Sequence, residues 1–281
     1  MSGAEAGVRD IFVDANHLRH HLVSRGQPGA PVVFMIHGLS GQAHSFDGIA
    51  TRLSSRYHVY CLDVRGRGES GWGKADEYHL GTYVDDLEHI RRALGIERFS
   101  LVGTSMGGLI ALHYTPRHQA NVARVVLNDI GPEIDTQGLQ RIRSYITDAP
   151  KMFPDLKAVV RYYEEHYAPM VAHLDRRAVE DFAQNHVRKN DVGVWVWKMD
   201  PAIRLLTQAP PPLDAWGNYA KITCPILIVR GQNSDVLNRA VAERMLKENE
   251  HAKLVEVPDV GHAPVLTEPA AADALEELLA D

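Results

Sequence analysis

A serine between glycines occupies a position in the chain where a serine side chain could act as a nucleophile. The pentapeptide Gly103-Thr104-Ser105-Met106-Gly107 follows the apolar run 99–102 and precedes a second apolar run, 108–114. The first run is typical of a strand and the second of a helix. A serine at so sharp a turn is held in a strained backbone conformation with its hydroxyl exposed, while the glycines let strand and helix approach closely. We therefore predict that Ser105 is a nucleophile.

A serine hydroxyl is un-ionised near neutral pH, so this nucleophile needs a histidine as general base and a carboxylate that orients the histidine. In a strand–turn–helix arrangement of this kind the three residues occur in the order serine, acid, histidine, each after a strand. His262 lies in a loop after the predicted strand 253–257. It is therefore the candidate base.

Two aspartates are candidates for the acid. Asp235 lies in the loop after the predicted strand 225–230, whereas Asp129 directly follows the predicted strand 123–128, one position earlier in the expected sheet. We favour Asp235, because it matches the expected order of strands. Asp129 remains the alternative.

Negative charge that develops on an attacked carbonyl oxygen needs two backbone N–H donors, which together form an oxyanion hole. Met106 would supply one donor, because it directly follows the nucleophile. Leu39 would supply the other from the loop 37–41, which follows the predicted strand 32–36. His37 in the same loop is a candidate for contact with the substrate, although we favour a role in bracing the loop.

Taken together, these motifs resemble the α/β-hydrolase fold superfamily over nearly all 281 residues. The matching residues are His37-Gly38, Asp63 to Ser70 after the predicted strand 57–62, the Ser105 turn, Asp235 and Gly261-His262. The resemblance implies a mostly parallel eight-stranded sheet flanked by helices, with a helical cap inserted after the sixth strand. It also implies that Ser105, Asp235 and His262 form a catalytic triad, and that Asp63 and Arg65 serve loop structure.

The order of the predicted elements indicates an α/β fold. Alternating residues over 9–24 predict an antiparallel edge hairpin. Six apolar strands follow, separated by helical patterns such as 83–94, which is typical of βαβ units whose strands are buried on both faces. The six strands are expected at 32–36, 57–62, 99–103, 123–128, 225–230 and 253–257.

This alternation stops after residue 129, and we expect the cap at 132–213 and the core at 1–131 and 214–281. The cap pattern predicts helices near 136–148, 155–167 and 175–189, an irregular aromatic stretch at 194–199, and a stiff return linker at Pro210-Pro211-Pro212. An apolar cap would exclude water and set substrate choice. Its candidate substrate-binding residues are Met152, Phe153, Tyr163, Tyr167, Trp195 and Trp197. Packing inside the cap is the more common role for each.

A serine nucleophile favours acyl transfer. The dehalogenases and epoxide hydrolases of the same superfamily use an aspartate at this turn, so Ser105 argues against both activities. We expect a carboxylesterase-like serine hydrolase that forms an acyl-enzyme from a small or medium ester. An amidase or a carbon–carbon bond hydrolase with the same triad is the alternative. A ligand receptor on the same fold is a more remote one.

Composition and net charge limit the classes of binding partner that we expect. The net charge is −6 and no cluster of lysine and arginine stands out, so we expect neither a nucleic acid nor a membrane partner, only a small-molecule acyl substrate. Fifteen histidines occur without metal-ligand spacing, and we expect no metal and no other cofactor. The first residues lack the pattern of a signal peptide and no apolar run could span a bilayer, which predicts a cytoplasmic protein.

Overall fold

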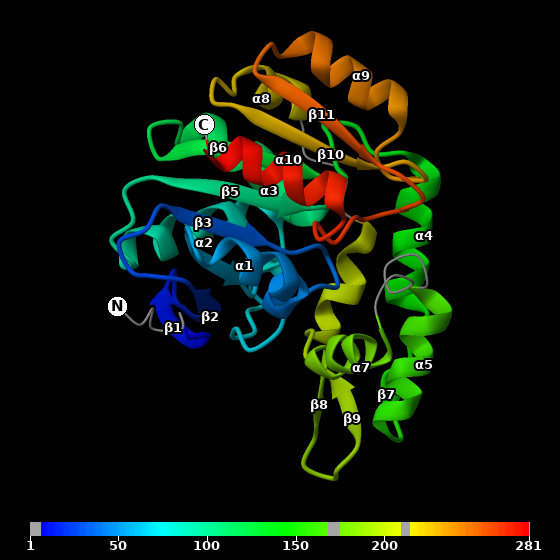
Figure 1. Cartoon of the computed structure of the whole chain (residues 1–281). Coiled ribbons are helices and arrows are strands. Elements are labelled where there is room, and N and C mark those ends of the chain that lie inside the picture. The colour runs from blue at the N-terminus through cyan, green and yellow to red at the C-terminus, as the bar shows by residue number, and fades with distance from the viewer. Residues whose placement is uncertain (1–6, 168–174, 209–213, 281) are drawn as a thin grey trace.

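The computed structural model describes residues 7–167, 175–208 and 214–280. Its centre is an eight-stranded sheet with the strand order β1-β2-β4-β3-β5-β6-β10-β11 (Figure 1). The strands are β1 (Arg9–Ala15), β2 (Leu18–Arg25), β3 (Val32–Ile36), β4 (His58–Leu62), β5 (Phe99–Thr104), β6 (Val122–Asn128), β10 (Ile226–Gly231) and β11 (Ala252–Val257).

The sheet is parallel from β4 to β11, and its antiparallel part is confined to one edge. There β1 pairs with β2, and β2 pairs with β4, in the antiparallel direction. Strands β3, β4, β5 and β10 are buried almost throughout, which explains why each reads as a continuous apolar run. The predicted eight-stranded α/β-hydrolase sheet is therefore confirmed.

Helices cover both faces of the sheet (Figure 1). One face packs against α1 (Asp47–Leu53) and α10 (Pro269–Ala280). The other face packs against α2 (Leu80–Ala93), α3 (Met106–Tyr114), α8 (Ala215–Ala220) and α9 (Arg239–Glu248). Short 3-10 turns occur at η1 (Ala43–Phe46), η2 (Ala75–Glu77), η3 (Thr115–Arg117) and η4 (Pro201–Gln208). Among the described helices, none is long and apolar enough to cross a membrane.

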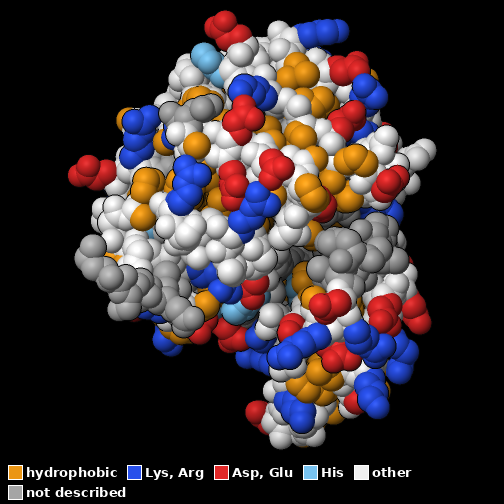
Figure 2. Space-filling view, viewed as in Figure 1, with side chains coloured by type: hydrophobic (Ala, Val, Ile, Leu, Met, Phe, Trp, Pro, Cys, Tyr) orange, Lys and Arg blue, Asp and Glu red, His pale blue; other side chains and the backbone are white. Residues whose placement is uncertain are grey.

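Between β6 and α8 the chain leaves the sheet and forms the elements that we call the cap. They are α4 (Thr136–Thr147), β7 (Met152–Phe153), α5 (Leu156–His166), α7 (Arg176–Asn185), β8 (Val187–Lys189) and β9 (Trp195–Trp197), followed by η4. Figures 1 and 2 show the cap as a lobe that projects from the core, and Figure 2 shows a hollow where the two meet. An apolar cluster of its own holds α5, α7 and the short strands together.

The cap is less helical than expected. Strands β7, β9 and β8 form a small antiparallel sheet, so the stretch 194–199 is not irregular, and the helix expected over 175–189 ends at Asn185. A tight turn explains the difference: Asn190 Oδ1 accepts hydrogen bonds from the N–H groups of Val192 and Val194, and Gly193 has a φ of 81°. The turn reverses the chain and pairs β8 with β9. The predicted triple-proline linker lies outside the described residues.

Gly107 fixes how closely the strand β5 and the helix α3 approach β3. A Cβ atom at Gly107 would lie 2.0 Å from the carbonyl oxygen of Ile36. This oxygen belongs to the backbone of β3, so the clash can be relieved only by a shift of the strand or the helix. We predict that Gly107→Ala lowers the free energy of unfolding by about 3 kcal/mol or more, measured by urea denaturation. Gly81→Ala in α2 is the matched control, because its Cβ would meet only the ring of His79, at 3.2 Å. That variant should stay within about 1 kcal/mol of the wild type. Equal effects of the two substitutions would contradict this account.

Candidate active site

Ser105 lies between the end of β5 and the first residue of α3, and its backbone is strained. Its φ of 51° and ψ of −114° are unusual for a residue with a side chain. Neighbouring glycines make this turn possible, since a Cβ at Gly103 would lie 2.2 Å from the carbonyl oxygen of Gly107. The turn presents the serine hydroxyl at the carboxyl ends of the parallel strands.

His262, in the loop after β11, connects the serine to a carboxylate. Its Nε2 lies 3.0 Å from Ser105 Oγ, and its Nδ1 lies 2.8 Å from Asp129 Oδ2. A carboxylate accepts hydrogen bonds, so Nδ1 carries the proton and Nε2 is left to accept the proton of the serine hydroxyl. These are the geometry and the tautomer of a general base next to a nucleophile.

Asp129 is the first residue after β6 and is completely buried. Its φ of 55° turns the side chain toward the neighbouring loop after β10. There Oδ1 accepts a hydrogen bond from the N–H of Gly231 at 2.9 Å, and Oδ2 accepts one from the hydroxyl of Ser234 at 2.6 Å. Three donors, with the imidazole of His262 among them, thus hold this carboxylate in place.

The prediction that Asp235 orients the histidine is wrong. Asp235 lies several residues beyond the end of β10, and its side chain is bound by the guanidinium of Arg141 from α4 of the cap. Partial burial alone would raise the pKa of Asp235, but Arg141 lowers it. The alternative candidate, Asp129, lies against His262 instead. It directly follows the last residue of β6, so its side chain stays close to the end of the strand. Asp235 instead joins the core to the cap.

The loop 37–41 lies beside the serine, as predicted. A Cβ at Gly38 would touch the Cβ of Ser105 at 3.4 Å, and Leu39 lines the cavity above the serine. No described residue accepts a hydrogen bond from the N–H of Leu39. Met106 begins α3, where backbone N–H groups have no partner inside the helix. Both amides belong to segments that adjoin Ser105, so they stay the candidate donors of an oxyanion hole.

His37 braces this loop with both ring nitrogens. Its Nε2 accepts a hydrogen bond from the N–H of Val64 at 3.0 Å, and its Nδ1 donates to the carbonyl oxygen of Gly38 at 2.7 Å. Burial lowers the pKa of His37 to about 4, so the ring is neutral at ordinary pH. The guanidinium of Arg67 also holds the loop, since Nε donates to the carbonyl oxygen of Leu39 at 3.1 Å. His37 lines the cavity, but its polar atoms are engaged within the protein.

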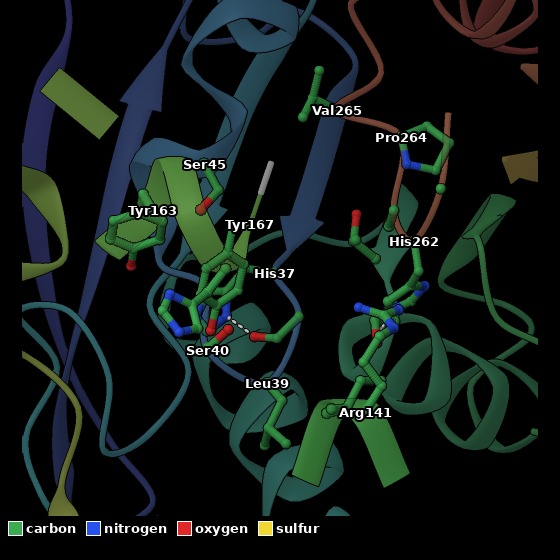
Figure 3. Close-up of a pocket in the computed structure, with 18 of the residues that line it drawn as sticks. His37, Leu39, Ser40, Ser45, Arg141, Tyr163, Tyr167, His262, Pro264 and Val265 are labelled. Carbon is green, nitrogen blue, oxygen red and sulfur yellow. Dashed lines mark hydrogen bonds between the residues drawn. The ribbon is translucent and has the colours of Figure 1, made fainter. Parts of the chain in front are cut away.

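A cavity of about 280 Å³ lies between the cap and the core, above the serine. Loops at the ends of the parallel strands form its floor, and α4, α5 and α7 supply the rest of the wall. Figure 3 shows Tyr163, Tyr167, Ser40, Ser45 and His37 on one side and Arg141, His262 and Pro264 on the opposite side. A mainly apolar pocket with a few polar groups is typical of a small-molecule site.

The structure separates the six cap residues that were candidates for substrate contact. Tyr163 and Tyr167 line the cavity. Phe153 and Trp195 pack in the apolar cluster of the cap, and Met152 is 58% exposed. Trp197 lines a smaller neighbouring cavity and donates its Nε1–H to the carbonyl oxygen of Pro150 at 2.7 Å. Of the six candidates, Tyr163 in α5 and Tyr167 directly after it thus reach the cavity above the serine.

Three polar residues of the cap that line the cavity were not predicted from the sequence: Arg141, His166 and His186. Each lies in or at the end of a cap helix, where nothing in the pattern distinguishes a residue that faces a cavity from one that faces solvent. Among the residues that the structure describes, no group of three or more His, Cys, Asp or Glu side chains could hold a metal ion.

Comparisons with known proteins agree with this architecture. The family model for the alpha/beta hydrolase fold matches residues 31–269. A 3-hydroxybutyrate-oligomer hydrolase from Cupriavidus necator is 33% identical over 256 residues, which is 87% of each chain. A 2-(acetamidomethylene)succinate hydrolase from Mesorhizobium japonicum is 26% identical over 238 residues, 85% of this chain and 84% of that protein. The crystal structure of an α/β hydrolase from Novosphingobium aromaticivorans superposes with a TM-score of 0.88 at 31% identity over 99% of each chain. This chain belongs to the α/β hydrolase fold family and is a hydrolase.

Proposed function

We propose that this protein is a serine hydrolase that cleaves a carboxylic ester of a small or medium-sized substrate through an acyl-enzyme. The observation that carries the proposal is the unbroken set of hydrogen bonds from Ser105 through His262 to Asp129. These residues come from three distant parts of the chain and meet at the floor of the cavity. This geometry supports nucleophilic catalysis, because each member is activated by the next.

Acylation begins when Ser105 Oγ attacks the ester carbonyl and His262 Nε2 takes the hydroxyl proton. Asp129 stabilises the imidazolium that results. The N–H groups of Leu39 and Met106 stabilise the negative carbonyl oxygen of the tetrahedral intermediate, and each donor contributes about 3 kcal/mol in comparable sites. The intermediate collapses, the bond to the alcohol oxygen breaks, and His262 protonates the departing alcohol.

Deacylation repeats these steps with water as the nucleophile. His262 takes a proton from the water while its oxygen attacks the acyl carbon, and the oxyanion is bound by the same two amides. The bond to Ser105 Oγ then breaks, His262 returns the proton to the serine, and the carboxylic acid leaves. No metal or organic cofactor takes part in this scheme.

Two further observations support an ester as the substrate. The cavity of about 280 Å³ fits a small or medium-sized acyl compound. The relative from Cupriavidus necator, 33% identical over most of its length, is named for hydrolysis of 3-hydroxybutyrate oligomers, whose units are joined by ester bonds. An amide, or a carbon–carbon bond beside a carbonyl, would place the same carbonyl carbon at Ser105. The test therefore compares the hydrolysis of esters with that of amides and of carbon–carbon bonds beside a carbonyl.

The test compares kcat/KM for short and long acyl esters, the matching amides and vinylogous diketones. We expect esters to give the highest kcat/KM, with many turnovers per enzyme molecule. A fluorophosphonate should label the wild type, and Ser105→Ala should lose both labelling and turnover. Ester turnover that survives Ser105→Ala would refute the serine mechanism, and a single burst without further turnover would favour a ligand receptor. Faster cleavage of amides or diketones would show that the proposed ester is wrong and that the faster substrate class is the right one.

A further inference from the structure

His186 is a polar side chain of the cavity wall that the ester-hydrolysis scheme does not use. It follows the last residue of α7, and its ring lines the cavity although the residue is only 6% exposed. Aromatic rings surround it: the centroid of Phe182 lies 4.6 Å away and that of Tyr163 lies 5.2 Å away. A polar ring buried in such a wall is costly unless its nitrogens find partners.

The two nitrogens of His186 differ. Nδ1 donates a hydrogen bond to the carbonyl oxygen of Phe182 at 2.7 Å, which fixes the proton on Nδ1 and leaves Nε2 with a lone pair. No described residue donates a hydrogen bond to Nε2. The Nε2 atoms of His20 and His113 are fully buried and have no hydrogen-bond partner, whereas Nε2 of His186 is not among the fully buried unpartnered atoms of the described residues. It is therefore an acceptor that a molecule in the cavity can reach.

The ring is also electrically neutral at ordinary pH. Burial, aided by the nearby ammonium of Lys198, lowers the pKa of His186 to about 4, although the hydrogen bond to the carbonyl of Phe182 opposes the shift. A neutral imidazole whose only proton is already donated offers no charge to an anion and no donor to a carbonyl. The group that Nε2 selects must itself be a hydrogen-bond donor.

The position of His186 places that donor at one end of the cavity. With Ser40, Gly41 and Gln42, His186 also lines the smaller neighbouring cavity, so it lies on the side of the loop 37–41. Figure 3 shows Ser40 and Ser45 on this same side, opposite Arg141. A hydroxyl suits such a wall better than an amide N–H, because it can donate to an imidazole and also accept from a serine hydroxyl.

We propose that Nε2 of His186 accepts a hydrogen bond from a hydroxyl group of the substrate, so that esters bearing a free hydroxyl are the preferred substrates. This inference rests on the proposed ester hydrolysis and specifies its substrate class. A site that is built to bind a hydroxyl discriminates against the analogue that lacks it, because the buried acceptor is then left unpaired.

The kinetic test uses p-nitrophenyl butyrate beside the 2-, 3- and 4-hydroxybutyrate esters and a 3-methoxy ester, whose ether oxygen cannot donate. We expect the wild type to favour one hydroxy ester over the butyrate by about tenfold in kcat/KM, with no such gain for the methoxy ester. In His186→Phe, which keeps a flat ring, the ratio should fall to about one. His186→Gln, which keeps an acceptor oxygen, should restore part of it. His166→Phe is the matched control for another histidine of the same wall, and it should keep the wild-type ratio.

A binding test separates this inference from the ester activity. Methyl 2-, 3- and 4-hydroxybutyrate and methyl butyrate are titrated by calorimetry into Ser105→Ala and into the double variant Ser105→Ala/His186→Phe. One hydroxy compound should bind to Ser105→Ala about tenfold more tightly than methyl butyrate does, and the double variant should bind that compound and methyl butyrate equally. Wild-type hydrolysis of all esters without preference would overturn the role of His186 and leave ester hydrolysis standing. Absence of any ester hydrolysis would remove the proposed function, and calorimetry would still decide whether His186 selects a hydroxyl.

Discussion

Asp129→Asn is expected to lower kcat for ester hydrolysis by about 10⁴-fold, whereas Asp235→Asn should change it by less than about tenfold. The reason lies in the hydrogen bonds of His262, whose Nδ1 contacts Asp129 Oδ2 at 2.8 Å. An asparagine amide can present its NH₂ group to the ring, which favours the tautomer with the proton on Nε2. That proton points at Ser105 Oγ, so the ring can no longer act as the base.

Each variant needs a control for folding, because Asp129 also binds the N–H of Gly231 and the hydroxyl of Ser234. Circular dichroism and thermal unfolding of both variants should show a folded protein, and labelling by a fluorophosphonate should slow in Asp129→Asn alone. Asp235→Asn weakens a cap contact in which both side chains are about a third exposed, so only a small loss of stability is expected. The reverse order of the two kcat values would return the catalytic role to Asp235.

The strands of the core could be predicted from sequence because burial on both faces requires a continuous run of apolar residues. A parallel strand that is covered on both sides is apolar at every position, and the predicted strands 32–36 and 99–103 match the observed strands β3 and β5 closely. The turn at Ser105 could also be predicted, because only glycine fits at neighbouring positions where a Cβ would lie about 2 Å from backbone atoms. Packing constraints of this kind act at single positions, so one sequence is enough to reveal them.

The acid could not be chosen from sequence because the choice depends on contacts between distant residues. Both Asp129 and Asp235 follow apolar strands, and both offer the same carboxylate. What separates them is the φ of 55° at Asp129, the Gly231 amide and the Ser234 hydroxyl that receive its side chain, and the guanidinium of Arg141 that receives the other. Arg141 belongs to the cap, so the role of a core aspartate depends on how an insertion folds back.

The cap shows a similar dependence at His186. Its sequence reads as a helix through residue 189, but α7 ends at Asn185 and the chain then enters β8. This ending lets Nδ1 of His186 donate to a carbonyl oxygen in the last turn of the helix while the residue still lines the cavity. A hydrophobic pattern predicts which face of a helix is buried, but it carries no information on where the last turn stops.

Acid should destabilise the protein strongly between about pH 6.5 and pH 4. Burial lowers the pKa values of His37 and His186 to about 4, against an ordinary value near 6.5 in the unfolded chain. Between these values the unfolded chain binds protons that the folded protein does not, so the free energy of unfolding falls as the pH falls. The contribution of each histidine is complete above about pH 6.5 and is lost by about pH 4. At about 1.4 kcal/mol per pKa unit, the loss is about 3 kcal/mol for each histidine.

His21 acts in the opposite direction. Burial alone would lower its pKa, but hydrogen bonds to Asp63 and Asp10 raise it, so its protonation stabilises the folded protein as the pH falls. One histidine with a raised pKa does not offset two whose pKa values fall to about 4. We therefore expect the net free energy of unfolding, measured by urea denaturation, to decrease as the pH falls from 7 to 4.

His186→Phe isolates one of the two contributions, because phenylalanine keeps a flat ring in the cap and cannot be protonated. Its free energy of unfolding should fall by about 3 kcal/mol less than that of the wild type between pH 7 and pH 4. Phe153→Leu is the control, since it disturbs the same apolar cluster without removing a titrating group and should shift the curve equally at every pH. A His186→Phe curve parallel to the wild-type curve would show that the ring takes up its proton at the same pH in the folded and the unfolded protein. Below about pH 6.5 such a ring would be a donor at both nitrogens, and a substrate hydroxyl could not donate to it there.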